Sequence, residues 1–265
     1  MDRKIWITAL FAVTGGTALA AAQETWAQTR DSGPRSLVIA CRVKPEHRVA
    51  LRRQMESAGV ASFEAWKNQG VFQEYHILFN SYLDAETYDM LTFLTFHDFS
   101  GVAKWRDIEK HHPGGLPATA LPLVQSAITY SLDGARQRSS PGHPAEHPAR
   151  GKSVFLIIPY DILIPTDDYV KYVETYVVPQ LDGWMEKNVL ACYTIYITRY
   201  STERPWGSLF VLEYRNNEAF GKREATIAKV REELKKNPAW LAASQNKQKI
   251  RTEKQTIIAE ELQRR

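Results

Sequence analysis

The strands predicted from this sequence carry apolar residues on both of their faces. Ser36–Val43, Met90–Phe96 and Val154–Ile158 are apolar almost throughout, and Leu91 and Phe93 lie on the face opposite to the other apolar residues of their strand. A strand with one face in water would alternate between apolar and polar residues. The pattern therefore predicts sheets that are covered on both faces.

Segments with helical spacing alternate with these strands and give the order β-α-β-β-α-β twice. Thr166 is expected to be the N-cap of one helix, and Pro179 is expected to kink or restart that helix. In the first copy the predicted elements are strand 36–43, helix 46–68, strands 71–80 and 90–96, helix 99–112 and strand 125–132. In the second copy they are strand 154–158, helix 166–184, strands 192–200 and 208–214, helix 218–236, a helical turn or two at 239–246, and strand 252–262.

The second copy follows the first at a spacing of 118 residues. The stretch Val71–Tyr82 (VFQEYHILFNSY) returns as Val189–Tyr200 (VLACYTIYITRY), with valine, tyrosine, isoleucine and tyrosine at matching places. Few of the other paired residues are identical, but the elements, turns and apolar runs stay in phase. We interpret the chain as one module used twice, with a first repeat at 36–133 and a second repeat at 152–265.

Two such repeats can cover each other's exposed sheet face. The fold class predicted is α+β, with two tandem ferredoxin-like β-α-β-β-α-β repeats whose antiparallel sheets face each other as a single-chain eight-stranded α/β barrel. In element order, repeat register and two-faced strands, Ser36–Leu262 resembles the dimeric α/β-barrel superfamily in its fused form. That superfamily includes cofactor-free monooxygenases of aromatic polyketides, haem-degrading and haem-dependent enzymes, and small-molecule isomerases. The resemblance implies a pocket between the sheet and the helices of one repeat, and it does not choose a chemistry.

The first 22 residues have the pattern of a secretory signal peptide. A charged start precedes the apolar run Ile5–Val13, and small residues follow it up to Ala21. The alternative is an uncleaved membrane anchor, which needs about 20 apolar residues, and this run is shorter. We therefore expect a periplasmic or secreted protein with no membrane segment after cleavage.

Composition excludes some partners and leaves others open. The net charge of +4 is too small to indicate a nucleic-acid partner. Cys41 and Cys192 are expected to be two buried thiols rather than a disulfide.

Residues 134–151 are rich in proline, glycine and charge, and they are expected to be an extended, mobile linker. Its two histidines, His143 and His147, are expected to belong to a solvated spacer rather than to a metal site.

Six residues on the predicted hairpin strands are candidates for ligand binding. A histidine near a cavity can polarise a carbonyl or move a proton, and an arginine can hold a carboxylate by two contacts. Each also has a plainer interpretation, as a packing tyrosine with a wet hydroxyl, a strand-end histidine or a rim charge paired with an acid. The candidates are Tyr75, His76, His97, Tyr193, Tyr196 and Arg199. If only one repeat keeps a pocket, we expect it in the first repeat, which carries the histidines.

Haem is the one cofactor with a candidate ligand, at His111 and His112 on the end of a predicted helix. Some haem-binding relatives place an axial histidine on the corresponding helix, but positive residues at a helix C-terminus also suit its dipole. Nucleotide-binding, phosphate-binding and common hydrolase motifs are absent from the sequence, and no metal site is predicted.

The leading hypothesis is therefore an exported protein that binds a small aromatic or apolar molecule and has the capacity to convert it without a metal. A haem-binding or cofactor-free oxidoreductase is one alternative. A structural or interaction module without an open pocket is another. The predicted partner is a small molecule, and the predicted state is a monomer or a weak homo-oligomer.

Overall fold

The computed structural model describes residues 35–140, 152–200 and 204–263. The predicted signal peptide at 1–22 lies outside these residues, as do His143 and His147. No helix within the described ranges is both long and apolar enough to cross a bilayer. We call residues 35–140 the first half and residues 152–263 the second half.

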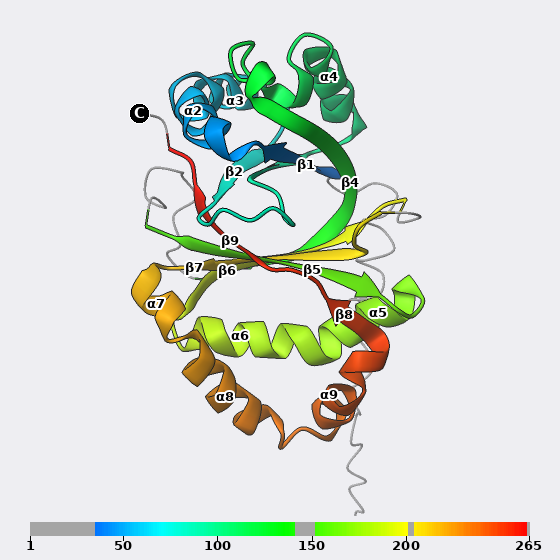
Figure 1. Cartoon of the computed structure of the whole chain (residues 1–265). Helices are drawn as coiled ribbons and strands as arrows, with labels where there is room; N and C mark the ends of the chain where they lie inside the picture. Colours follow the sequence, from blue (N-terminus) through cyan, green and yellow to red (C-terminus); the bar gives the residue numbers. More distant parts are fainter. Residues whose placement is uncertain (1–34, 141–151, 201–203, 264–265) are drawn as a thin grey trace, which may run out of the picture.

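Each half contains four main strands and the helices that connect them (Figure 1). The first half comprises β1 (Arg35–Val43), η1 (Pro45–His47), α2 (Arg48–Gln54), the π-helical η2 (Met55–Gly59), α3 (Val60–Asn68), β2 (Glu74–Asn80), β3 (Met90–Phe96), α4 (Phe99–Glu109), η3 (Pro113–Gly115), η4 (Leu121–Leu123) and β4 (Val124–Ser139). The second half comprises β5 (Val154–Ile162), α5 (Thr166–Tyr172), the π-helical η6 (Val173–Val177), α6 (Val178–Glu186), β6 (Leu190–Thr198), β7 (Ser208–Tyr214), α7 (Asn217–Gly221), α8 (Arg223–Leu234), α9 (Pro238–Ile250), β8 (Arg251–Glu253) and β9 (Ile257–Glu261).

The strands form one large antiparallel sheet. Their order is β7-β6-β4-β1-β3-β2-β9-β5, the pairing returns from β5 to β7, and β8 adds to the end of β5. The two halves join where β4 pairs with β6 and where β2 pairs with β9. Every strand pair named here is antiparallel, which agrees with the antiparallel α+β class predicted from the sequence.

Three buried cores separate the layers of the molecule. Figure 1 shows α2, α3 and α4 over the strands of the first half, and α5 to α9 on the opposite side of the molecule. One core lies between each group of helices and its strands. The third lies between the two sets of strands and takes side chains from both, among them Val38, Phe93, Ile157 and Leu209. Both sheet faces are thus covered, as the apolar pattern predicted.

Details of local structure recur at the spacing of 118 residues. The π-helical segments η2 and η6 occupy equivalent positions, and β3 and β7 begin and end at equivalent residues. Gly70 and Asn188 both adopt a positive φ at the end of the long helix. Asp98 and Asn216 both cap the helix that follows the hairpin, with a side-chain oxygen that accepts backbone N–H donors. The two halves therefore use the same turns as well as the same element order.

The fourth strand of the first half is longer than the sequence predicted. It was expected to end at Leu132, but β4 runs to Ser139 and pairs with β6 inside the segment expected to be a linker. The polar residues beyond Leu132 look like a linker because they carry no apolar period. Their backbone is nevertheless paired, and Arg136 and Arg138 form ion pairs with Glu174 and Asp182 of the second half.

Of two expectations about the helix that begins near Thr166, the N-cap is wrong and the restart near Pro179 is confirmed. Thr166 is the first residue of α5 rather than its N-cap, which is Pro165 without a side-chain hydrogen bond. α6 restarts at Val178 with a proline in its first turn, as expected for Pro179. The first half has the same π-helical interruption without a proline, so Pro179 is not its cause.

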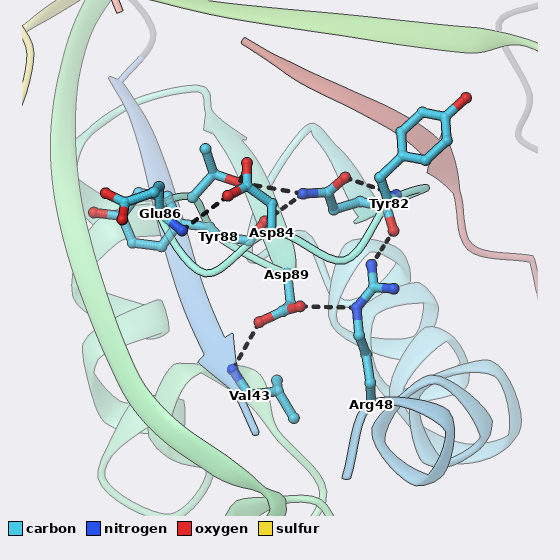
Figure 2. A network of polar contacts seen from close by, with 9 residues as sticks. Val43, Arg48, Tyr82, Asp84, Glu86, Tyr88 and Asp89 are labelled. Atoms are coloured by element: carbon cyan, nitrogen blue, oxygen red, sulfur yellow. Dashed lines mark hydrogen bonds and ion pairs between the residues drawn. The ribbon is translucent and has the colours of Figure 1, made fainter. Parts of the chain in front are cut away.

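A buried carboxylate anchors the connection between β2 and β3 (Figure 2). Asp89 accepts hydrogen bonds from the backbone N–H of Val43 at 2.8 Å and from Nε of Arg48 at 2.8 Å. Arg48 also donates to the carbonyl oxygen of Asn80. Asp84 accepts bonds from the Glu86 N–H and, from the other half of the chain, the Gln255 amide at 2.9 Å. The polar connection between β2 and β3 thus ties β1, α2 and the hairpin together.

Candidate functional site

The second half contains a cavity between its strands and its helices. Its volume is about 310 Å³. Apolar and aromatic side chains line one part of it: Ile158, Tyr160, Tyr176, Val177, Leu181, Trp184, Phe210, Leu212 and Ile227. Polar and charged side chains line the rest: Gln180, Arg223, Arg231, Lys247, Gln248, Arg251, Thr252 and Glu253. A mostly apolar hollow with a few convergent polar groups is the usual form of a small-molecule site.

The cavity lies where the two halves differ in side-chain volume. In the first half, Phe63 and Trp105 are fully buried and stack with their ring centroids 5.9 Å apart. The positions 118 residues later are Leu181 and Arg223, which both line the cavity. Two large rings are thus replaced by a smaller aliphatic side chain and a cation. The space that the aromatic cluster fills in the first half remains open in the second.

Hydrogen bonds fix two arginines on the α8 side of the cavity. Nε of Arg223 donates to the hydroxyl of Tyr214 at 3.1 Å, and Nε of Arg231 donates to Oε1 of Gln180 at 2.9 Å. Gln180 is buried and donates in turn to the carbonyl oxygen of Tyr176 at 2.8 Å. Among the described residues, Nε is the one nitrogen of Arg231 that donates a hydrogen bond, so its two Nη groups are available to a ligand.

Arg251 covers the aromatic part of the cavity wall. Its guanidinium carbon lies 3.9 Å from the ring centroid of Tyr160, 4.9 Å from that of Phe210 and 5.5 Å from that of Tyr172. Burial raises the pKa of Tyr160, and its hydroxyl donates to Glu253 at 3.3 Å. Among the residues that the structure describes, no carboxylate lies within ion-pair distance of Arg251. Its charge is stabilised by aromatic faces instead.

Two of the predicted site tyrosines face the helices and hold equivalent positions. Tyr75 donates to Glu64 at 3.0 Å, and Tyr193 donates to Asp182 at 2.9 Å. Both rings are almost completely buried, and burial raises the pKa of both hydroxyls. Neither residue lines the cavity of the second half. In each, the ring is packed in the core and the hydroxyl has a hydrogen-bond partner. This agrees with the plainer interpretation of these tyrosines as packing residues.

His76 and Tyr196 are brought together between the two sets of strands. Nδ1 of His76 lies 2.7 Å from Glu261, and its Nε2 lies 3.2 Å from Glu74. Burial alone would lower the pKa of His76, but the attraction and hydrogen bonds of the two carboxylates raise it to about 10. The ring of Tyr196 stacks on Phe93 with centroids 5.5 Å apart. Cys192 and Glu213 also line the small space that His76 and Tyr196 share.

His97 and Arg199 lie apart from both spaces. His97 is exposed just beyond the end of β3. Nε of Arg199 forms an ion pair with Asp133 at 2.9 Å, so this charge is matched within the protein. The structure therefore brings two of the six predicted residues together and distributes the other four over separate surroundings.

His111 and His112, the candidate haem ligands, lie at the surface of the first half. Both side chains are exposed beyond the end of α4, and the ring of His112 lies against Trp66 with centroids 5.5 Å apart. Neither histidine lines the cavity of the second half or the hollow beside η3 and η4 in the first half. Within those same ranges, no group of three or more histidine, cysteine, aspartate or glutamate side chains has a metal-binding arrangement. Cys41 and Cys192 are buried free thiols, as predicted.

Reasoning from the sequence missed most of the cavity residues. The stripe formed by Tyr169, Tyr172 and Tyr176 was a usable signal, because its rings pack beside the cavity and Tyr176 stacks on Trp240 of α9 at 5.1 Å. If only one repeat kept a pocket, it was expected to be the first. The second half has the cavity described above, and the first half has a hollow of its own beside η3 and η4, lined by Glu109, Gln125 and Thr129. Arg251 carried no signal, because its place depends on α9, which is longer than predicted.

The fold of this chain is similar to that of several solved proteins. A candidate monooxygenase from Lactobacillus acidophilus NCFM aligns over 86% of this chain and 94% of its own, with 12% identity and a TM-score of 0.54. A second candidate monooxygenase, from Fusobacterium nucleatum subsp. nucleatum, aligns over 88% and 94%, with 10% identity and a TM-score of 0.53. An anthrone oxidase-like protein aligns over 88% and 92%, with 10% identity and a TM-score of 0.52.

Identities this low establish similarity of fold alone. No protein-family model matches the sequence, and no curated protein sequence matches it.

Proposed function

We propose that this protein binds a small aromatic or apolar molecule in the cavity of its second half. The observation that carries the proposal is the replacement of Phe63 and Trp105 by Leu181 and Arg223, which opens about 310 Å³ beside an aromatic wall. A packing defect would leave apolar walls only. This space instead contains a buried glutamine that positions an arginine.

The proposed scaffold is a single-chain α/β barrel made of two ferredoxin-like repeats. It is supported by the strand order, in which the pairing returns from β5 to β7, and by the core that both halves share. In this scaffold the first repeat, filled by its aromatic cluster, supports the second repeat, which holds the ligand. We further propose that the chain is exported, on the basis of its first 22 residues.

Filling the cavity tests the binding function. 1-Naphthoate and its uncharged analogue 1-naphthamide serve as probes, and quenching of tryptophan fluorescence reports binding because Trp184 lines the cavity. Leu181→Phe places in the second half the ring that the first half already has, and we expect it to weaken both probes by about tenfold or more. Phe63→Leu, the reverse change in the first half, should leave both affinities unchanged. Equal binding by wild type and Leu181→Phe would contradict the proposal.

A second candidate function is cofactor-free oxidation of the bound molecule. Tyr160 and Glu253 form a hydrogen-bonded acid–base pair on the cavity wall, at 3.3 Å. The anthrone oxidase-like neighbour suggests an anthrone as the substrate to try. Oxygen uptake with 1,8-dihydroxyanthrone that Glu253→Gln abolishes would support this candidate. Binding of the anthrone without oxygen uptake would reject oxidation and leave the binding function intact.

A further inference from the structure

The charges of the cavity point to one class of ligand. Four cationic side chains line it, namely Arg223, Arg231, Lys247 and Arg251, against a single carboxylate, Glu253. That carboxylate accepts a hydrogen bond from Tyr160, and it forms no ion pair with any of the four cations among the described residues. Arg223 also forms an ion pair with Glu224, which does not line the cavity. The lining itself thus has an excess of positive charge, carried by Arg231, Lys247 and Arg251, next to an aromatic wall.

Two buried donors on the lining lack acceptors. Nη1 of Arg251 and Nε1 of Trp184 are both inaccessible to solvent, and neither has a hydrogen-bond partner among the described residues. The hydroxyl of Tyr172 is also buried and has no hydrogen-bond partner among these residues. The buried hydroxyl of Tyr169 interacts with Arg251 and with Ser208. Buried polar groups in native proteins are nearly always paired, so an unpaired cluster needs an explanation. Arg251 thus enters the cavity lining with no counter-ion among the described residues.

The equivalent region of the first half shows that the scaffold does not require these charges. Trp105 occupies the position of Arg223, and Phe96 occupies that of Tyr214, so an apolar pair replaces a hydrogen-bonded polar pair. The first half has no counterpart of α9, which leads directly into Arg251. The cations are therefore specific to the half that has the cavity.

We propose that the cavity recognises a small aromatic or apolar carboxylate, with its carboxylate held by Arg251 and its apolar body against Tyr160, Phe210 and Trp184. This inference rests on the proposed function and names the class of ligand for the same cavity. A planar guanidinium can bind both oxygens of a carboxylate, and a desolvated pair of this kind is stronger than a neutral hydrogen bond. The aromatic rings under Arg251 hold it in place before the ligand arrives.

Comparison of the two probes tests this assignment. Wild type should bind 1-naphthoate about tenfold or more tightly than 1-naphthamide, because only the carboxylate matches the buried charge. Arg251→Gln should abolish that preference and keep the affinity for 1-naphthamide. Arg204→Gln is the matched control, since Arg204 also lies over an aromatic ring, that of Tyr130, outside the cavity. This variant should keep the full preference.

The outcomes separate the two proposals. Equal affinities of wild type for both probes, or a preference that survives in Arg251→Gln, would overturn the carboxylate assignment while cavity binding stands. Failure of both probes to bind would overturn the assignment and the proposed function together. If Arg251→Gln loses its thermal transition, Arg251→Lys retains the charge without the planar fork. This variant should show a reduced preference, and an undiminished one would count against the assignment.

Discussion

At the residue scale, buried charges are held by several partners rather than by one. The carboxylate of Asp89 receives a backbone N–H and a guanidinium N–H from two different elements, and it is almost inaccessible to solvent (Figure 2). Arg48 in turn stacks over Phe79, with its guanidinium carbon 4.9 Å from the ring centroid. Removing one partner of such a buried charge destabilises the protein strongly, because the remaining charge is left buried and uncompensated.

Replacement of Asp89 by asparagine should therefore lower the free energy of unfolding by about 2 to 4 kcal/mol. The amide removes the negative charge that Arg48 needs and can present its NH₂ group to the Val43 N–H. Urea denaturation followed by circular dichroism measures the change. Glu86→Gln in the same turn is the control and should be neutral within about 0.5 kcal/mol, because that side chain is exposed. A similar loss of unfolding free energy in both variants would show that the stabilisation comes from the turn as a whole and not from the buried pair of Asp89 and Arg48.

His76 gives the stability a dependence on pH. Its folded pKa of about 10 exceeds the ordinary value of 6.5, because Glu261 and Glu74 outweigh the effect of burial. A raised pKa means that the stabilisation is complete below about pH 6.5 and disappears as the pH rises through about 10. The stability advantage of wild type over His76→Gln should shrink over this window by about 1 to 3 kcal/mol.

Denaturant midpoints at pH 6, 8 and 10 for both proteins measure this change. Glu261→Gln should flatten the pH dependence in the same way, because it removes the nearer of the two carboxylates. A difference between wild type and His76→Gln that stays constant from pH 6 to pH 10 would show that His76 is not charged in the folded protein.

At the element scale, the sequence predicted the repeated order and its spacing but not every boundary. β3 and β7 match their predicted limits, because both are short apolar runs between turns. The predicted helix 218–236 is broken into α7 and α8 at Lys222, where charged residues give no signal of a break. The extension of β4 was invisible because its polar residues are stabilised by pairing with β6, far away in the sequence.

Gly101 illustrates how tightly α4 approaches the turn between α3 and β2. A Cβ built there would lie 2.6 Å from the backbone oxygen of Val71, which cannot move aside as a side chain can. We expect Gly101→Ala to cost about 1 to 3 kcal/mol of unfolding free energy, although alanine favours a helix.

Gly221→Ala is the matched test of helix propensity alone. A Cβ at Gly221 meets no atom within 4 Å, so this change should be neutral or should stabilise the protein by up to about 1 kcal/mol. Thermal unfolding of both variants measures the contrast. If Gly101→Ala were as stable as wild type, the close approach of α4 to Val71 would be relieved by a shift of the helix.

At the scale of the whole molecule, the proposed site depends on differences between the two halves, whereas the sequence pattern revealed only what the halves have in common. Periodicity identifies positions that are buried in both copies, so it directed attention to Tyr75 and Tyr193, which are equivalent and structural. The cavity depends on volume lost at Leu181 and on a cation brought in by α9. These two features can be recognised only in the packed structure, because none of the residues involved belongs to a distinctive sequence motif.

The core between the two sets of strands makes the halves mutually dependent, and Phe93 with Tyr196 is its clearest contact across them. A double-mutant cycle of Phe93→Leu and Tyr196→Leu should give a coupling of about 0.5 to 1.5 kcal/mol in the free energy of unfolding. The control cycle pairs Phe93→Leu with Tyr193→Phe. Tyr193 lies in the core on the other face of β6, so its coupling should be close to zero.

Phe93→Leu and Tyr196→Leu also test whether the two halves unfold cooperatively. Because each half contributes side chains to the shared core, removal of either ring should lower a single unfolding transition seen by both tryptophan fluorescence and far-ultraviolet circular dichroism. Two separate transitions, with only one of them shifted by Phe93→Leu, would mean that the halves are stable on their own. In that case the first repeat would not be needed to hold the cavity-bearing second repeat in shape.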